Sequence, residues 1–364
     1  MKILHIIDHI GIGGVQTSLR GITEKERNNL NIFYYFLRNN KIKTEINNLN
    51  CYFCNSYSKL NIKSLFELKK LIKDQNISIL HCHLQKSFVF GYLLKIVFFK
   101  NIKLIFHERG KIFENKRWYN FFLKKAQNKV DLFIAISRET ENKLTENAKV
   151  EHDKIKVLYN SVDLNRFDLN INKYNKSQNK KLEGSKIENN DFVIGFAARI
   201  VERKGCDDLI HAFNKLENKK NIKLVIAGDG HQKDNCVKLV DKLNLDNNIF
   251  FLGCILDMVQ FYSSIDCFII PSHWEPFGVV ALEAQAMRVP VVASDVPGLN
   301  EIIFDGENGL LFESKNSKSL AKKIKLIRND KKLREKIIKN GFRDVKKYSI
   351  DNYLIKLKSI YDGL

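Results

Sequence analysis

Residues 271–287 read Pro-Ser-His-Trp-Glu-Pro-Phe-Gly-Val-Val-Ala-Leu-Glu-Ala-Gln-Ala-Met and lie between two apolar runs. These runs, 267–270 and 291–294, are short and continuous, which is typical of buried strands in a parallel sheet. Between them a helical pattern extends from about Phe277 to Met287, and Pro290 follows its end. The stretch therefore predicts a strand, a loop, a helix and a second strand, in that order.

Two carboxylates flank the start of this helix. Glu275 lies in the loop before it, and Glu283 lies about two turns inside it. The first N–H groups of a helix have no acceptor within the helix, and they readily bind phosphate. We therefore expect a ligand that carries phosphates at the helix start and hydroxyls that donate to the two carboxylates. Spacing alone leaves open the alternative of two solvated glutamates on a surface helix.

The whole stretch resembles the E-x7-E signature of the retaining glycosyltransferases of family 4, which have the GT-B fold. The matching residues are Glu275, Pro276, Phe277, Gly278, Leu282 and Glu283, followed by Pro290, Val291, Val292 and Ala293. The resemblance implies an α/β protein with two doubly wound Rossmann-like domains that face a central cleft. It implies that Glu275 binds the transferred sugar and takes part in catalysis, and that Glu283 binds the ribose of the donor. The helix start, Phe277, Gly278 and Val279, would bind the donor phosphates.

Strands and helices alternate in the first half of the chain. The expected strands are 3–7, 32–37, 77–83, 103–106 and 131–137, and an amphipathic helix is expected at 64–74. Such alternation predicts a parallel sheet with helices on both faces, and ligands bind such sheets at the carboxyl ends of the strands. His83 and His107 occupy two of these ends. The resemblance implies that His83, His107 and Arg109 lie on the acceptor side, with His107 catalytic.

A glycine-rich loop, Gly11-Ile12-Gly13-Gly14, follows the first strand. Its spacing is not the G-x-G-x-x-G of dinucleotide-binding proteins, and no clear acidic residue closes a second strand about twenty residues on. A dinucleotide site is therefore disfavoured. The resemblance instead implies that Gly13 and Gly14 approach the diphosphate and sugar of the donor.

Two cations, Arg199 and Lys204, flank a loop after the strand expected at 192–198. A site for a nucleoside diphosphate needs cations there, or a metal held by carboxylates. No Asp-x-Asp triplet occurs in the sequence, which disfavours the metal. The two residues match the R-x4-K-G pattern of the resembled family, which implies donor-binding and catalytic roles for both. Ordinary surface charges are the alternative.

Residues 169–190 are polar, rich in Asn and Lys and without sustained periodicity, which predicts a linker between two domains. The expected N-terminal, acceptor-side domain is 1–168, and the expected nucleotide-sugar-binding domain is 191–345. In the resembled family a C-terminal helix returns to the first domain. The resemblance implies that residues from about 346 to 364 do so here.

The composition, with 44% hydrophobic and 28% charged residues, is that of a globular protein. The formal net charge is +20, mostly from residues 1–168, which favours an anionic surface or ligand; the alternative is a Lys- and Asn-rich composition throughout. Basic and aromatic residues mix in 111–129, which suits a membrane interface or nucleic acid; the alternative is an ordinary core-facing helix with a cationic outer face. We expect no signal segment and no membrane span, and seven scattered Cys favour a reducing cytoplasm.

Together with the resemblance, these observations predict an enzyme of the EC 2.4 class that moves a hexosyl or N-acetylhexosaminyl group from a UDP- or GDP-sugar to a hydroxyl. The resemblance implies that the configuration is retained. No metal and no other cofactor are expected. The expected setting is the synthesis of a bacterial envelope polysaccharide (O-antigen, capsule or lipopolysaccharide) at the cytoplasmic face of the membrane. The acceptor would be a lipid-linked saccharide, and no nucleic acid partner is expected. The alternatives are a sugar-nucleotide epimerase on the same fold and a basic protein that binds lipid or RNA.

Overall fold

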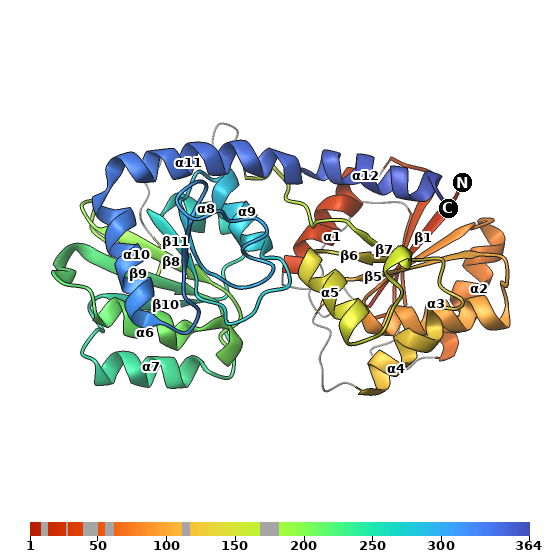
Figure 1. Cartoon of the computed structure of the whole chain (residues 1–364), viewed down its shortest axis with the longest axis horizontal. Helices are drawn as coiled ribbons and strands as arrows, with labels where there is room; N and C mark the ends of the chain where they lie inside the picture. Colours follow the sequence, from red (N-terminus) through yellow and green to blue (C-terminus); the bar gives the residue numbers. More distant parts are fainter. Residues whose placement is uncertain (9–13, 27, 39–49, 55–61, 111–116, 168–181) are drawn as a thin grey trace. The chain divides into compact units, whose positions relative to one another are not determined.

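The computed structural model describes residues 1–8, 14–26, 28–38, 50–54, 62–110, 117–167 and 182–364. Within these residues the chain divides into two compact units (Figure 1). The first unit consists of Met1–Val162 together with Ile350–Leu364, and the second is Asp163–Ser349. Residues 168–181, which make up most of the predicted linker, lie outside the described residues.

The first unit contains a parallel sheet of seven described strands, in the order β3-β2-β1-β4-β5-β6-β7. The strands are β1 (Ile3–Ile7), β2 (Ile32–Phe36), β3 (Cys51–Phe53), β4 (Ile79–His83), β5 (Lys103–Glu108), β6 (Leu132–Ala135) and β7 (Ile155–Val157). From β1 the chain first adds β2 and β3 on one side of the sheet, and it then adds β4 to β7 on the other side. Because crossovers between parallel strands are right-handed, this reversal places helices on both faces of the sheet.

Six described helices and a 3₁₀ turn complete the first unit. They are α1 (Gly14–Lys25), α2 (Ile62–Asp74), α3 (Leu84–Val97), α4 (Arg117–Ala126), α5 (Arg138–Glu146), η1 (His152–Lys154) and α12 (Ile350–Asp362). In one core cluster, the helices α2, α3, α4 and α5 pack against strand residues such as Leu4 and Leu80. In a second cluster, α1 and α12 pack against Ile3 and Ile79. Alternate residues of each strand therefore face the two cores. The C-terminal helix α12 lies beside α1 (Figure 1).

The second unit repeats this architecture with six described strands, in the order β10-β9-β8-β11-β12-β13. They are β8 (Phe192–Ala197), β9 (Ile222–Ala227), β10 (Ile249–Gly253), β11 (Cys267–Ile270), β12 (Val291–Ser294) and β13 (Leu310–Phe312). The strand order reverses between β8 and β11, so the loops after these two strands lie at the switch point of the sheet. That is the usual ligand site of a doubly wound fold.

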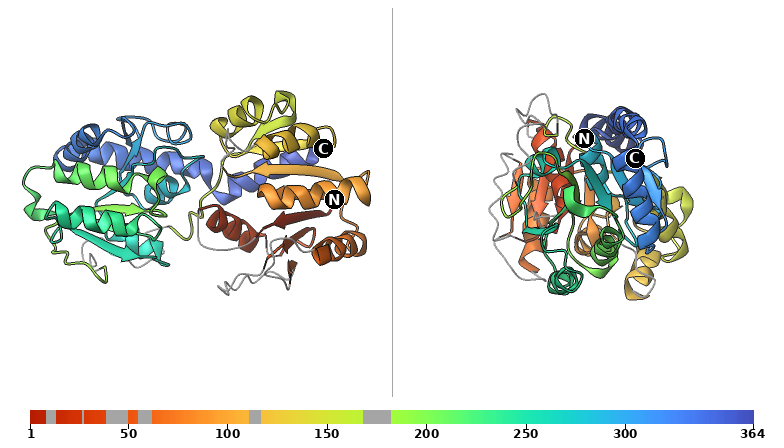
Figure 2. Two further views of the ribbon diagram at one scale, coloured as in Figure 1. Left: turned by 90° about the horizontal axis from the view of Figure 1, so that it is seen from below. Right: turned by 90° about the vertical axis from the view of Figure 1, so that its left-hand side faces the viewer.

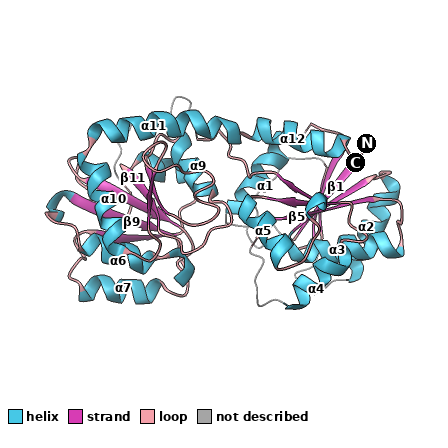
Figure 3. Ribbon diagram, viewed as in Figure 1, coloured by secondary structure: helices cyan, strands magenta, loops and turns pink. Residues whose placement is uncertain are grey.

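The helical elements of the second unit are α6 (Cys206–Asn214), α7 (Lys233–Lys242), α8 (Met258–Ser263), α9 (Val279–Ala286), α10 (Ser317–Asn329) and α11 (Lys331–Val345), with 3₁₀ turns η2 (Glu202–Lys204), η3 (Lys219–Asn221) and η4 (Lys346–Tyr348). Helices α9 and α11 pack together, and α10 packs on α6. Figure 3 shows helices on both sides of each sheet, and Figure 2 shows the same layering from two further directions.

The predicted fold class, with two doubly wound α/β units, is confirmed by these two parallel sheets. Each strand expected in the first half occurs at the expected place, with ends that differ by up to a few residues. The sequence pattern does not predict β3, β7 and β13. Each has only three residues, which is too short for a recognisable period.

The segment 111–129, with mixed basic and aromatic residues, contains α4, while 111–116 lies outside the described residues. Tyr119, Leu123 and Ala126 of α4 are buried in the core, and Trp118 and Phe121 are exposed. The helix thus has an ordinary core face, and contact of its outer face with a membrane stays a prediction. None of the described helices combines the length and apolar character needed to cross a membrane.

Candidate functional site

The helix predicted after Glu275 is α9, and a glycine sets its start. Gly278 is the N-cap, with φ of 97° and ψ of 53° in the left-handed region. A Cβ there would lie only 2.5 Å from the side chain of Leu299. The first turn of α9 contains no acidic residue, and its leading N–H groups have no acceptor inside the helix. The start of α9 is therefore suited to an anionic group.

Glu275 and Lys204 form an ion pair between two loops of the second unit. Glu275 precedes α9, whereas Lys204 ends η2, which follows β8. Their side chains are 11% and 13% exposed, so the pair is largely shielded from water, and Ser272 Oγ donates to Glu275 Oε2 at 3.3 Å. Because β8 and β11 are neighbours at the switch point, residues 71 positions apart in the sequence meet here.

Gly205 holds Lys204 close to the end of β11. Its φ is +64°, and a Cβ there would lie 2.1 Å from the carbonyl oxygen of Pro271. Gly306 has a similar φ of +72°, but a Cβ there would meet no described atom within 4 Å.

This contrast gives a matched pair of substitutions. We expect Gly306→Ala to lower the free energy of unfolding by the backbone strain alone, about 1–2 kcal/mol. Gly205→Ala should cost at least twice as much, because its methyl group also displaces the backbone of Pro271. Denaturant unfolding of the two variants measures the difference. Equal losses would contradict the close approach of the two loops.

Glu283 is buried inside α9. Tyr262 of α8 donates its hydroxyl to Glu283 Oε2 at 3.0 Å. Burial raises the pKa of Glu283 to about 7, against the lowering effects of the Tyr262 hydrogen bond and of the charge of Arg166. Near neutral pH both protonation states are therefore populated. The carboxylate accepts hydrogen bonds at both oxygens, whereas the acid keeps one O–H that must donate.

Arg199 follows β8 and has an exposed side chain. Its neighbours are tied to the end of β9: Ala198 N–H donates to Ala227 O at 3.1 Å, and Ile200 N–H donates to Asp229 O at 2.9 Å. These bonds fix the backbone of Arg199 at the carboxyl edge of the sheet, the same edge that carries Lys204. The guanidinium itself is not part of the ion pair between Lys204 and Glu275.

Four buried histidines lie together in the first unit: His5 of β1, His81 and His83 of β4, and His107 of β5. These strands are adjacent, and their register pairs His5 with His81 and His83 with His107. Strand residues two positions apart share a face of the sheet. All four rings therefore lie on the face that α1 and α12 cover, at the switch point between β1 and β4.

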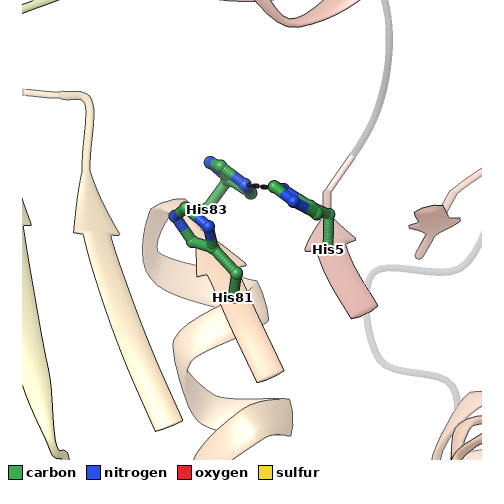
Figure 4. Close-up of side chains that lie close together, drawn as sticks. All are labelled: His5, His81 and His83. Atoms are coloured by element: carbon green, nitrogen blue, oxygen red, sulfur yellow. Dashed lines mark hydrogen bonds between the residues drawn. The ribbon is translucent and has the colours of Figure 1, made fainter. Parts of the chain in front are cut away.

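Hydrogen-bond contacts join these rings to one another and to α12. His5 Nδ1 and His83 Nε2 are 2.9 Å apart (Figure 4), and His81 Nε2 and His107 Nδ1 are 3.0 Å apart. The Tyr361 hydroxyl lies 2.6 Å from His81 Nδ1 and 3.2 Å from His5 Nε2. A residue of the last helix is thus built into the histidine cluster.

The cluster holds its imidazoles neutral. Burial, with a further contribution from the charge of Arg109, lowers the pKa of His5 to about 3. Burial is also the largest cause of the lowered pKa of His81, His83 and His107, each of which lies well below its ordinary value. A neutral imidazole has one N–H and one acceptor nitrogen, so each ring is able to donate once and to accept once.

Arg109 is buried beside these rings and donates three hydrogen bonds. Its Nε donates to His83 Nδ1 at 3.1 Å, Nη1 to Asn160 Oδ1 at 2.8 Å, and Nη2 to the Tyr353 hydroxyl of α12 at 2.8 Å. The structure therefore brings together the three predicted acceptor-side residues, Arg109 with His83 and, through the cluster, with His107.

For two of the predicted donor-binding residues, Gly13 and Gly14, the structure describes no contact with the other predicted site residues. Gly13 lies outside the described residues, and Gly14 is the first residue of α1. Conversely, the sequence patterns single out neither His5 nor His81. In the described part of the chain, His5, His81 and His83 form a group whose ligand atoms lie within 4.8 Å of one another, as a metal site requires.

Two family models match the sequence. The model "Glycosyl transferases group 1" matches residues 177–344, and the model "Glycosyltransferase Family 4" matches residues 40–166. Together they span most of both structural units. The first includes Arg199, Lys204, Glu275 and Glu283, and the second includes His83, His107 and Arg109.

Relatives and solved structures agree with these matches. The chain is 30% identical over 310 residues to the capsular polysaccharide biosynthesis glycosyltransferase CapM of Staphylococcus aureus, covering 83% of this chain and 80% of CapM. It is 31% identical over 170 residues to the N,N'-diacetylbacillosaminyl-diphospho-undecaprenol alpha-1,3-N-acetylgalactosaminyltransferase of Campylobacter jejuni, covering 47% of this chain and 44% of that enzyme. The structure is similar to HepE of Anabaena in complex with UDP and glucose, with a TM-score of 0.85, 21% identity and full coverage of both chains.

Proposed function

The chain belongs to the glycosyltransferases of family 4, with the GT-B fold, and from this premise we propose that it transfers a hexosyl or N-acetylhexosaminyl group from a UDP-sugar with retention of configuration. That it is a nucleotide-sugar glycosyltransferase follows from its family. The choice of UDP is supported by HepE, which was solved with UDP-glucose. The alternatives of an epimerase and of a basic lipid- or RNA-binding protein lose their support, because these relatives are named as transferases.

The observation that carries the proposal is the Lys204–Glu275 ion pair beside the start of α9. Transfer requires that the diphosphate leave the sugar, and its growing negative charge needs fixed positive groups. Lys204 and the backbone N–H groups of Phe277, Gly278 and Val279, which lie at or just before the start of α9, supply them. Glu275 accepts hydrogen bonds from hydroxyls of the transferred sugar, and Glu283 accepts hydrogen bonds from those of the ribose.

Binding of a donor would rearrange the ion pair. The Nζ of Lys204 turns toward the phosphates, which offer it two negative charges in place of one. Glu275 then exchanges its ammonium partner for sugar hydroxyls, and Ser272 remains as a neutral donor to its Oε2. Arg199 adds a second cation at the same edge of the sheet. Gly13 and Gly14 stay proposed donor-binding residues.

On the acceptor side, we assign His107 to the reacting centre, with His83 and Arg109 behind it. The acceptor is a saccharide hydroxyl, and the proposed acceptor class is lipid-linked. The Campylobacter jejuni relative, which is named for an undecaprenol-linked saccharide, supports this class, and CapM supports a role in an envelope polysaccharide. With such an acceptor and a nucleotide-sugar donor, the proposed place of action is the cytoplasmic face of the membrane.

The donor site is tested by calorimetric titration of the protein with UDP-glucose, UDP-N-acetylglucosamine and GDP-mannose, in excess chelator and without acceptor. We expect saturable binding of a UDP-sugar, because cations of the chain take the place of a metal. Binding that appears only after Mg²⁺ or Mn²⁺ is added would overturn the metal-free site. Binding of the GDP-sugar alone would overturn the choice of base.

The same titration tests Glu283. We expect Glu283→Gln to weaken UDP binding by about tenfold to a hundredfold, the value of a hydrogen bond to a charged group. In the unsubstituted protein affinity should rise with pH through about 7, the pKa of Glu283, because the carboxylate is the better acceptor. The variant should lose this dependence. Glu335→Gln, on the exposed face of α11, is the matched control and should change neither property.

A further inference from the structure

The contacts of the histidine cluster form a single unbranched series that begins at Arg109. The series runs from Arg109 Nε to His83, from His83 to His5, from His5 to Tyr361, from Tyr361 to His81, and from His81 to His107. Each ring uses one nitrogen toward each neighbour. At its far end, the buried His107 Nε2 has no hydrogen-bond partner among the described residues.

Arg109 gives this series a direction. Its Nε–H only donates, so His83 Nδ1 must accept and His83 carries its proton on Nε2. His83 Nε2–H then donates to His5 Nδ1, which leaves the proton of His5 on Nε2. That N–H donates to the oxygen of Tyr361, whose own proton is left for His81.

Tyr361 passes this direction on to His81 and His107. The Tyr361 O–H donates to His81 Nδ1 at 2.6 Å, so His81 is protonated on Nε2. His81 Nε2–H donates to His107 Nδ1, which fixes the proton of His107 on Nε2. We infer that Arg109 and Tyr361 lock four neutral histidines in one tautomer and that this directional series presents the Nε2–H of His107 as a buried donor awaiting an acceptor.

A metal ion does not fit this arrangement. His5, His81 and His83 have metal-site spacing, but five of their six ring nitrogens already face a neighbouring ring or the Tyr361 hydroxyl. The sixth, His83 Nδ1, accepts from the Arg109 guanidinium, whose charge repels a cation. An added proton is also excluded. It would have to bind the Nδ1 of one of the four rings, and each Nδ1 already faces a hydrogen-bond donor.

A buried donor without an acceptor is rare in a native protein and calls for a partner. The chemistry that completes it is an oxygen with a free lone pair, such as a saccharide hydroxyl or a phosphate oxygen. Only this last step rests on the proposed function. In that reading Arg109, His83, His5, Tyr361 and His81 are positioning residues that act through His107, and α12 is part of the site through Tyr361.

The tautomers are measured directly by long-range ¹H–¹⁵N correlation spectra of the histidine side chains, in the full chain and without substrate. We expect His5, His81, His83 and His107 each to show a protonated Nε2 and an acceptor Nδ1. Mixed tautomers, or a protonated Nδ1 at any of the four, would overturn the inference. So would metal-bound nitrogens that are released by chelator.

Tyr361→Phe cuts the series at its middle and keeps the ring that packs in the core. We expect His83 and His5 to keep their tautomers, because Arg109 still fixes them, while His81 and His107 become mixtures. Tyr353→Phe is the matched control: it lies on the same helix and bonds Arg109, but it stands outside the series. All four tautomers should survive it. Identical spectra for the two variants would contradict the proposed direction.

Steady-state kinetics of the two variants give a second, independent test. Tyr361→Phe should lower kcat by up to about tenfold, with KM for the donor changed much less, since one neutral hydrogen bond selects the tautomer of His107. Tyr353→Phe should retain kcat. If the tautomers behave as expected but kcat does not change, the proposed role of His107 fails and the series stands. If the tautomers are mixed in the unsubstituted protein, the series fails whatever the activity.

Discussion

Lys204→Met is expected to lower kcat by about a hundredfold to a thousandfold, the usual effect of removing one preorganised charge-stabilising group. Methionine keeps the apolar stem of lysine and deletes the charge. In the proposed reaction the ammonium faces a diphosphate that gains negative charge as the sugar departs. The interaction is therefore stronger in the transition state than in the bound donor. Steady-state kinetics at saturating donor measure the loss.

The ion pair with Glu275 offers a competing explanation, and stability separates the two. Lys204→Met leaves a largely buried carboxylate unpaired, which costs up to about 3 kcal/mol of unfolding free energy. Adding Glu275→Gln removes that charge and should restore most of the stability. It should not restore kcat, because the cation is still absent and the carboxylate proposed to bind the sugar is removed as well. Recovery of kcat in the double variant would mean that Lys204 acts only by neutralising Glu275.

Two neighbouring arginines complete the test. Arg203 precedes Lys204 in η2 and is exposed, so Arg203→Ala should leave kcat unchanged. Arg199→Ala should lower kcat by about tenfold, less than Lys204→Met, because the field of an exposed guanidinium is screened by water. An unchanged kcat with a raised KM in Lys204→Met would instead assign the lysine to binding of the ground state.

The parts of the site that lie close together in the sequence could be predicted from it. The start of α9 follows from a strand, a loop with Gly278 and a helical pattern within about twenty residues. Glu275 and Glu283 are placed by the same segment. The pairing of Glu275 with Lys204 could not be read from spacing, since it depends on β8 and β11 being neighbours in the sheet.

The histidine cluster shows more clearly what could not be predicted from the sequence. His5 and His81 do carry a signal, because each lies two positions from a core isoleucine, Ile3 or Ile79, on the same strand face. Only the strand order, with β1 between β2 and β4, shows that those faces adjoin. Tyr361 is 280 positions from His81, and no periodicity within α12 distinguishes its hydroxyl from that of any other helical tyrosine.

The same cluster makes the first unit sensitive to mild acid. A histidine held neutral in the fold takes up a proton on unfolding, so its stabilising contribution is complete above about pH 6.5 and is lost as pH falls below it. The lowered pKa values of His5, His81, His83 and His107 all act in this direction. At pH 5.5 four such groups together cost about 5 kcal/mol, which is comparable with the stability of a whole domain.

Other buried groups oppose this trend but do not cancel it. In the first unit, burial raises the pKa of Glu26, so acid favours its folded form. In the second unit, the pKa of Glu283 is raised to about 7, and lowering the pH from 8 to 5 should stabilise that unit by up to about 3 kcal/mol. The two units should therefore respond to acid with opposite sign, and hydrogen exchange can follow each of them in the intact chain.

We expect exchange protection in β1, β4 and β5 to collapse between pH 6.5 and 5, while β8, β9 and β11 remain protected. The slope of stability against pH gives the difference in bound protons between the unfolded and folded states, to which the four histidines contribute up to four and from which Glu26 subtracts. Tyr361→Phe should reduce this slope, because His81 and His107 lose the donor that disfavours their protonation. Equal acid sensitivity of the two units would show that the cluster is not the cause, since only the first unit contains it.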